Sequence, residues 1–81
     1  MTHGWFSRPV EIAVGVSGSI RHISNAEQAV ELLTGQWRDI GSAPHGAALR
    51  ACRRAISGEV AADNAREAFI SAARAAHVLV E

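Results

Sequence analysis

The stretch that decides the fold is AADNAREAFISAARAAH, residues 61–77. On a helix of 3.6 residues per turn, one side of this stretch carries only alanine and one phenylalanine, and the opposite side is polar. The apolar side consists of Ala62, Ala65, Phe69, Ala72, Ala73 and Ala76. Because alanine side chains are short, we expect this helix to approach its neighbours closely. The pattern therefore predicts a packing element, with Phe69 as its large core side chain.

The length of the chain sets the scale of the core. At 81 residues, we expect a single domain over 1–81, with a small core and a thin margin of stability. Cys52 is the only cysteine, so an intrachain disulfide is excluded, and the ligand spacing of a structural zinc site is missing. Self-association is the remaining way to stabilise so small a domain, so a homodimer is one expectation.

Charge and the N-terminal sequence restrict the class of protein. All eight basic residues are arginine and are balanced by eight acidic residues, which gives a formal net charge of zero. This balance disfavours a dedicated nucleic-acid-binding domain and attachment to anionic membranes. The N-terminus has no basic and apolar signal pattern, and the apolar runs are far too short for a membrane span. We therefore expect a cytoplasmic protein without a membrane partner.

Alternating apolar residues predict a hairpin before the first helix. Val10, Ile12 and Val14 have the period of two that is typical of a half-buried strand. The glycines and serines of residues 15–19 predict a turn, after which residues 20–23 return as a second strand. Ile20 and Ile23 cannot both point inward on a regular strand, so the register stays open.

Capping signals predict two further helices. Ser24 and Glu27 have the spacing of a capping box, so we expect Ser24→Ala to cost about 1 kcal/mol. The apolar side of this first helix is Ala26, Ala29, Val30, Leu33 and, if the helix continues past Gly35, Trp37. A second helix begins near Pro44, with Ser42 or Ala43 as its cap, and ends at Gly58. Its apolar side is His45, Ala48, Leu49, Cys52 and Ile56.

These elements define the expected fold class. Residues 78–80 are β-prone, and because a lone hairpin is marginally stable we expect them to add a third strand. The sequence thus predicts an α+β fold in which a small antiparallel sheet of two or three strands packs against three α-helices.

The clearest candidate binding residues are three arginines on the second helix. Arg50, Arg53 and Arg54 share one exposed face, and no acidic residue interrupts that helix. Their guanidinium groups are able to hold phosphates or an acidic protein surface. The simpler interpretation is a solvated face, with Arg53 and Arg54 stabilising the end of the helix dipole.

Two apolar residues are further candidates for an interaction surface. Trp37 lies beside Arg38, a composition found in interface hot spots, although the simpler interpretation, which we favour, is a tryptophan that closes the end of the core. Ile70 lies off the main apolar stripe of its helix, beside Arg66, where it is a candidate for a subunit contact.

Motifs for catalysis or cofactor binding are missing. The sequence has no GxGxxG, GxxxxGK[ST], HExxH or GxSxG motif. His45 and Cys52 are two helical turns apart, about 10 Å, which is too far to share a metal or to form a nucleophile pair. We therefore expect no catalytic residue, no cofactor and no metal, and no enzyme.

The chain resembles a family of short, mainly alpha-proteobacterial proteins, the domain of unknown function 982 family. The resemblance spans essentially the whole chain and rests above all on Ala65-Arg66-Glu67-Ala68-Phe69-Ile70-Ser71-Ala72-Ala73. Its other landmarks are Trp5 ahead of Pro9 and Val10, the Gly15 turn, Ala29 with Leu33 and Trp37, and Gly41. The resemblance implies a compact α+β fold with a few strands and three helices. It brings no established activity, cofactor or catalytic residue.

Two hypotheses on function follow. The first is a non-enzymatic module that binds another protein or itself, with Trp37 and Ile70 as candidate contact residues. The alternative is a nucleic-acid-binding regulator that uses Arg50, Arg53 and Arg54.

Overall fold

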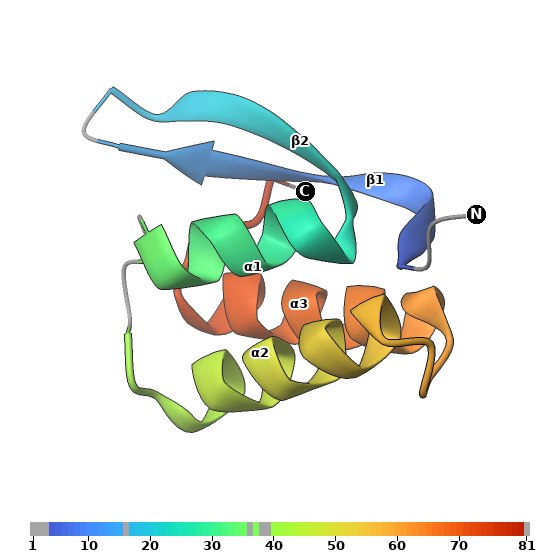
Figure 1. The fold of residues 1–81 in the computed structure, drawn as a ribbon. Helices are drawn as coiled ribbons and strands as arrows, with labels where there is room; N and C mark the ends of the chain where they lie inside the picture. The colour runs from blue at the N-terminus through green and yellow to red at the C-terminus, as the bar shows by residue number, and fades with distance from the viewer. Residues whose placement is uncertain (1–3, 16, 36, 38–39, 81) are drawn as a thin grey trace.

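A computed structural model describes residues 4–15, 17–35, 37 and 40–80. Its elements, in chain order, are β1 (Trp5–Val14), β2 (Ser19–Asn25), α1 (Ala26–Gly35), α2 (Ala43–Ile56) and α3 (Ala62–Ala75). The two strands form an antiparallel hairpin that covers α1 and α3, and α2 lies on the far side of these helices from the hairpin (Figure 1). The α+β class, with a hairpin against three helices, is the one that the sequence predicts.

Helix α3 packs against both α2 and β1, and so connects the two sides of the domain. Its predicted apolar side is confirmed: Phe69 is fully buried, Ala62 is half-buried, and the other alanines of that side are buried, namely Ala65, Ala72, Ala73 and Ala76. Alanines make up about half of the buried hydrophobic residues that the structure describes. The few large, fully buried side chains are Phe69, Ile12, Ile23, Leu33 and Cys52.

Strand β1 begins five residues earlier than the alternating pattern indicates. Trp5 pairs with Asn25 and Val10 pairs with Ile23, so five steps along β1 are matched by only two along β2. Pro9 lies in this irregular part, where its missing N–H removes no ladder hydrogen bond. The irregularity breaks the period of two, which is why residues 5–9 carry no strand pattern in the sequence.

The register of the hairpin settles which isoleucine of β2 faces the helices. Val10 opposite Ile23 buries both, whereas Ile20 is 49% exposed. The predicted turn is confirmed for the described residues: Gly15 and Gly18 have φ of +75° and +70°, and the Gly18 N–H donates to the Gly15 carbonyl. These positive φ values favour glycine at both ends of the turn.

The cap of α1 is Asn25, so the prediction that Ser24 caps this helix is wrong. The Asn25 Oδ1 accepts from the Gln28 N–H at 2.8 Å, and the Gln28 Oε1 accepts from the Ser24 N–H at 2.8 Å. The reciprocal pair is thus shifted by one residue, because β2 continues to Asn25 and makes Asn25 the last extended residue before the helix. The first N–H of the helix, that of Ala26, donates to the Gly4 carbonyl at 2.8 Å.

Helix α2 begins where the sequence predicts, and of the two candidate caps, Ser42 and Ala43, the cap is Ser42. The Ser42 Oγ accepts from the N–H of His45, and the His45 ring is buried with its Nε2 at 2.7 Å from the Leu33 carbonyl. This contact ties the start of α2 to α1. At the other end of α2, Gly58 has a φ of +82°, and the Glu59 N–H donates to the Arg54 carbonyl, as in a Schellman motif.

Residues 78–80 return to β1 but form a single bridge rather than the expected third strand. Helix α3 ends in a Schellman motif in which His77, at φ 59°, takes the left-handed position and the Val78 N–H donates to the Ala73 carbonyl. The chain then turns so that Leu79 bridges Ile12. Hydrogen bonds flank the bridge, from the Ala13 N–H to the Val78 carbonyl and from the Val80 N–H to the Glu11 carbonyl.

The shifted cap gives a direct test of the α1 boundary. We expect Asn25→Ala to lower the free energy of unfolding by about 1 kcal/mol, because the Gln28 N–H loses its acceptor. Ser24→Ala, the matched control, is expected to change it by less than about 0.5 kcal/mol, since the structure gives the Ser24 hydroxyl no part in the cap. Urea denaturation of both variants measures the difference. A larger loss for Ser24→Ala would contradict the assignment.

Candidate functional site

The structure divides the three arginines of α2 between different surroundings. Arg50, Arg53 and Arg54 are all exposed. Arg50 and Arg54 line a shallow hollow of about 270 Å³ together with Val60 and Asn64, whereas Arg53 lies outside this lining. The predicted arginine face is therefore present, but only two of its three members share a surface feature.

Trp37 is a core residue, which corrects the prediction that it belongs to an interaction surface. Its side chain is 6% exposed, and its ring centroid lies 5.6 Å from that of Phe69. Its Nε1 is buried without a hydrogen-bond partner among the described residues. Helix α1 ends at Gly35, so Trp37 lies beyond the helix, and its ring packs on α3. The other interpretation of this residue, closure of the core, is the one that the structure shows.

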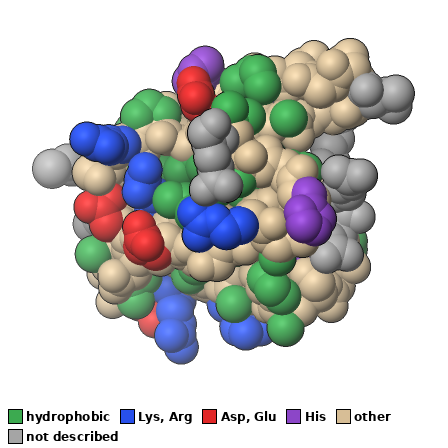
Figure 2. Space-filling model, turned by 180° about the vertical axis from the view of Figure 1, so that it is seen from behind, with side chains coloured by type: hydrophobic (Ala, Val, Ile, Leu, Met, Phe, Trp, Pro, Cys, Tyr) green, Lys and Arg blue, Asp and Glu red, His purple; other side chains and the backbone are tan. Residues whose placement is uncertain are grey.

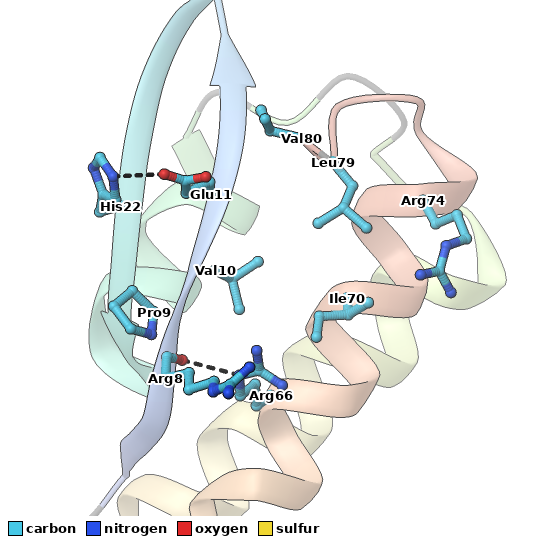
Figure 3. A pocket seen from close by; sticks show the side chains of 10 residues that line it. All are labelled: Arg8, Pro9, Val10, Glu11, His22, Arg66, Ile70, Arg74, Leu79 and Val80. Atoms are coloured by element: carbon cyan, nitrogen blue, oxygen red, sulfur yellow. Dashed lines mark hydrogen bonds and ion pairs between the residues drawn. The ribbon is translucent and has the colours of Figure 1, made fainter.

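Ile70 lies in the larger surface feature, a groove of about 430 Å³ between β1 and α3. Figure 3 shows that Val10, Ile70 and Leu79 point into the space between the strand and the helix. Ile70 and Leu79 are half-buried, so they give the groove an apolar floor that is still accessible. The residues that line this groove are Arg8, Pro9, Val10, Glu11, His22, Arg66, Ile70, Arg74, Leu79 and Val80.

The wall of the groove on α3 is a single row of side chains. Arg66, Ile70 and Arg74 follow one another at intervals of four residues, so they lie on the same face of the helix. This spacing is visible in the sequence, but the strand that the row faces depends on long-range packing. For that reason the sequence indicated Ile70 beside Arg66 and gave no indication of Arg8 or Arg74 as site residues.

Two long-range hydrogen bonds fix α3 against the irregular part of β1. The Ser7 N–H donates to the Asp63 Oδ1 at 3.0 Å, and the Arg66 Nε–H donates to the Arg8 carbonyl at 2.9 Å. These bonds satisfy backbone groups of a strand edge. They also hold the Arg66 guanidinium beside Arg8, at one end of the groove (Figure 3).

The groove is positively charged in a chain that is neutral as a whole. Among the described residues that line it, three are arginines and one, Glu11, is a carboxylate. The Glu11 Oε2 lies 2.8 Å from the His22 Nε2, at the other end of the groove from Arg8 and Arg66 (Figure 3). On the face seen in Figure 2, basic and acidic side chains lie close together with apolar side chains between them. This arrangement suits the binding of an anionic group next to an apolar one.

The remaining titratable candidates are engaged in packing. Cys52 is fully buried in α2, and burial raises the pKa of its thiol to about 11, so the thiol stays protonated at neutral pH. The buried His45 ring contacts the Leu33 carbonyl and the Gly41 N–H. Among residues 4–15, 17–35, 37 and 40–80, no three His, Cys, Asp or Glu side chains are grouped so as to hold a metal ion.

The fold and the groove define a small α+β domain with a mixed basic and apolar surface site. The chain belongs to the family described as "Protein of unknown function (DUF982)", whose model matches residues 8–80. It is similar to the NMR structure of Agrobacterium tumefaciens protein Atu1219, with 36% sequence identity and a TM-score of 0.80. That match covers 96% of this chain and 77% of the Agrobacterium chain. The comparison with curated proteins gave no match.

The family and the solved structure confirm the resemblance found in the sequence. Within the part of the chain that the structure describes, none of the helices has the length and apolar character needed to cross a membrane.

The bond between Ser7 and Asp63 predicts a pH dependence of stability. The Ser7 N–H holds the pKa of Asp63 below its usual value. The pKa of Asp63 is therefore lower in the folded state than in the unfolded state. The contribution of the Ser7–Asp63 bond to stability is present above the unfolded pKa of about 3.9 and is lost as the pH falls through the folded-state pKa. We expect Asp63→Asn to be less stable than the unmodified chain at pH 7, with the gap narrowing below about pH 4.

Urea denaturation at pH 7 and in the acid range measures this gap. Glu31→Gln, which changes an exposed carboxylate on α1, is the control. A gap for Asp63→Asn that is unchanged in acid would contradict the assignment.

Proposed function

We propose that this protein is a non-enzymatic module that binds a partner protein in the cytoplasm, through the groove between β1 and α3. The observation that carries the proposal is the position of Ile70, half-buried in the floor of a groove of about 430 Å³ with Arg66 and Arg74 on either side of it along α3. An accessible apolar floor with a charged rim is the usual anatomy of a protein-binding surface.

The rest of the described chain supports binding rather than catalysis. Cys52 and His45 are held in the core, and the one titratable pair in the groove, Glu11 and His22, is largely exposed to water. Solvent screens the contact between two side chains that are so exposed. The groove also differs from the predicted surface, because Trp37 takes no part in it.

Replacement of Ile70 tests this function. We expect Ile70→Ser to weaken binding of a partner, first captured from an extract of cells that express the protein and then purified, by about tenfold or more, since the apolar floor is lost. The control is Ile40→Ser, which removes an isoleucine that is 64% exposed elsewhere on the surface. Titration of the purified pair by calorimetry gives the affinities. Equal binding by the two variants, or an extract without a partner, would contradict the proposal.

The same variants test self-association. If a second copy of the chain occupies the groove, sedimentation will show a dimer that Ile70→Ser dissociates and Ile40→Ser leaves intact.

Nucleic-acid binding through α2 is the alternative function. It is supported by the exposure of Arg50, Arg53 and Arg54 and by the hollow that Arg50 and Arg54 share with Asn64. Against it, Glu59 lies at the end of the same helix, where its N–H donates to the Arg54 carbonyl and its carboxylate accepts from the Ser57 hydroxyl. The carboxylate reduces the local positive charge.

The alternative predicts a steep dependence on salt. If α2 holds nucleic acid, replacing all three arginines with alanine abolishes its retention, and the affinity of the unmodified chain falls with salt in proportion to a few phosphate contacts. Fluorescence anisotropy with a labelled duplex at several salt concentrations measures both effects. Unchanged retention, or a flat response to salt, would exclude this function.

A further inference from the structure

The groove has a spacing that selects its occupant. Arg66, Ile70 and Arg74 are separated by four residues each, so the two arginines are about 12 Å apart along the axis of α3, with Ile70 midway. An extended chain rises about 3.3 Å per residue, so side chains at positions i and i+4 are about 13 Å apart and point to the same side, with i+2 between them. The two spacings coincide.

From this match we propose that the groove receives an extended segment of a partner protein with two acidic side chains four residues apart and an apolar side chain midway between them. The inference rests on the proposed function and adds the chemistry of the partner. The acidic side chains contact Arg66 and Arg74, and the apolar side chain packs on Ile70.

The charges in the groove support an acidic occupant. Arg8 and Arg66 lie at the same end, where the Arg66 Nε–H is bound to the Arg8 carbonyl (Figure 3). Two positive charges at one end of the groove attract an anion to that end. The Arg66 Nη1 lies 3.6 Å from the Glu67 Oε2, but the Glu67 side chain is 76% exposed, so a partner's carboxylate can replace this contact at small cost.

The Arg66 side chain is also well placed before binding. It is 21% exposed, and its Nε bond fixes the orientation of the guanidinium plane. A planar donor held in this way loses little side-chain entropy when it binds a carboxylate. Arg66 is therefore the contact that we expect to contribute most to the affinity.

The apolar floor distinguishes a peptide from a nucleic acid. Ile70 and Leu79 offer a surface for an aliphatic side chain, and the described residues that line the groove include no Phe, Tyr or Trp ring on which a base could stack. The imidazole of His22 is held by Glu11. At the opposite end, Glu11 is held by His22 and repels a further acidic residue. The groove therefore favours acidic residues only along the row of α3.

A synthetic peptide gives the first test. The probe is the N-acetylated, C-amidated peptide Ser-Glu-Thr-Val-Thr-Glu-Ser, and the two control peptides carry either Gln in place of both Glu or the two Glu side by side. Binding is followed by amide chemical shifts of the 15N-labelled chain. We expect the probe to shift Val10, Ile70 and Leu79 and to bind about tenfold more tightly than either control. Equal binding of the probe and the Gln peptide, or shifts confined to other surfaces, would overturn the proposal.

Paired arginine variants provide the second test. We expect the double variant R66Q,R74Q to lose about tenfold or more in affinity for the probe, and the matched variant R50Q,R54Q, which removes the same charge from α2, to stay within about twofold. Because Arg66 also holds β1, the single variant R74Q is measured as well and is expected to lose affinity for the probe, with its fold checked by the amide spectrum of the free chain. The proposal would be overturned if R74Q and R66Q,R74Q kept full affinity for the probe, or if these arginines bound duplex DNA more tightly than the probe.

The outcomes separate this inference from the proposed function. If binding of the purified partner depends on Ile70 but R66Q,R74Q binds it with full affinity, the inference of an acidic segment is wrong and the proposed binding module stands. If Ile70→Ser also leaves the affinity for the partner unchanged, the inference of an acidic segment and the proposed binding function of the groove are both wrong.

Discussion

The close approach of α3 to its neighbours is the constraint on which the rest of the structure depends. Four of its buried residues are Ala65, Phe69, Ala72 and Ala73, so the helix has a nearly flat face with a single large ring. This shape lets α3 contact α2 and β1 together. The Phe69 ring fills the space that the alanines leave, and Trp37 packs on it from beyond the end of α1.

A core built in this way has little apolar area per residue, and its stability depends on good fit. Leu33, Ile12 and Ile23 are its other large, fully buried hydrophobic side chains apart from Cys52. Larger residues on α3 would push the helix away from β1 and α2, because packed interiors tolerate added volume poorly. The hydrogen bonds at the edges of the domain, such as that of His45 to the Leu33 carbonyl, then hold the helix ends in place.

The edge of β1 shows how covering a strand also creates a surface site. Asp63 and Arg66 satisfy the Ser7 N–H and the Arg8 carbonyl, and the bridge at Leu79 covers the edge further along. An uncovered edge would invite pairing with other chains. Between the hydrogen bonds of Asp63 and Arg66 and the bridge at Leu79, β1 and α3 are far enough apart to leave the groove. Arg66 therefore both binds the strand edge and forms part of the groove wall.

The sequence was a good guide to elements with a regular local pattern. The apolar side of α3, the cap at Ser42 and the glycine turn at Gly15 and Gly18 all follow from local spacing and backbone preference. The start of β1 did not, because the irregular pairing around Pro9 removes the period of two. The cap at Asn25 was displaced by one residue, because the end of β2 decides which polar side chain is left to face the helix.

The candidate site was harder to predict because it depends on the distance between elements rather than on any one of them. The row of Arg66, Ile70 and Arg74 can be seen in the sequence, yet its meaning depends on Arg8 and Leu79 arriving from opposite ends of the chain. Trp37 illustrates the reverse case, since its neighbours in sequence suggested exposure and its neighbours in space bury it.

Net charge was a weak guide to binding in this protein. A chain with equal numbers of acidic and basic residues has no net charge from which a strong long-range field would arise. Over a few ångströms, however, the local arrangement of charges decides what a surface binds. The described lining of the groove has three arginines and one carboxylate, Glu11, which His22 already holds. Since Arg66 also fixes α3 against β1, its loss alone cannot separate binding from folding. Arg74, exposed two turns further along α3, belongs to the same row, so its replacement tests the row while the Arg66 bond to the strand stays in place.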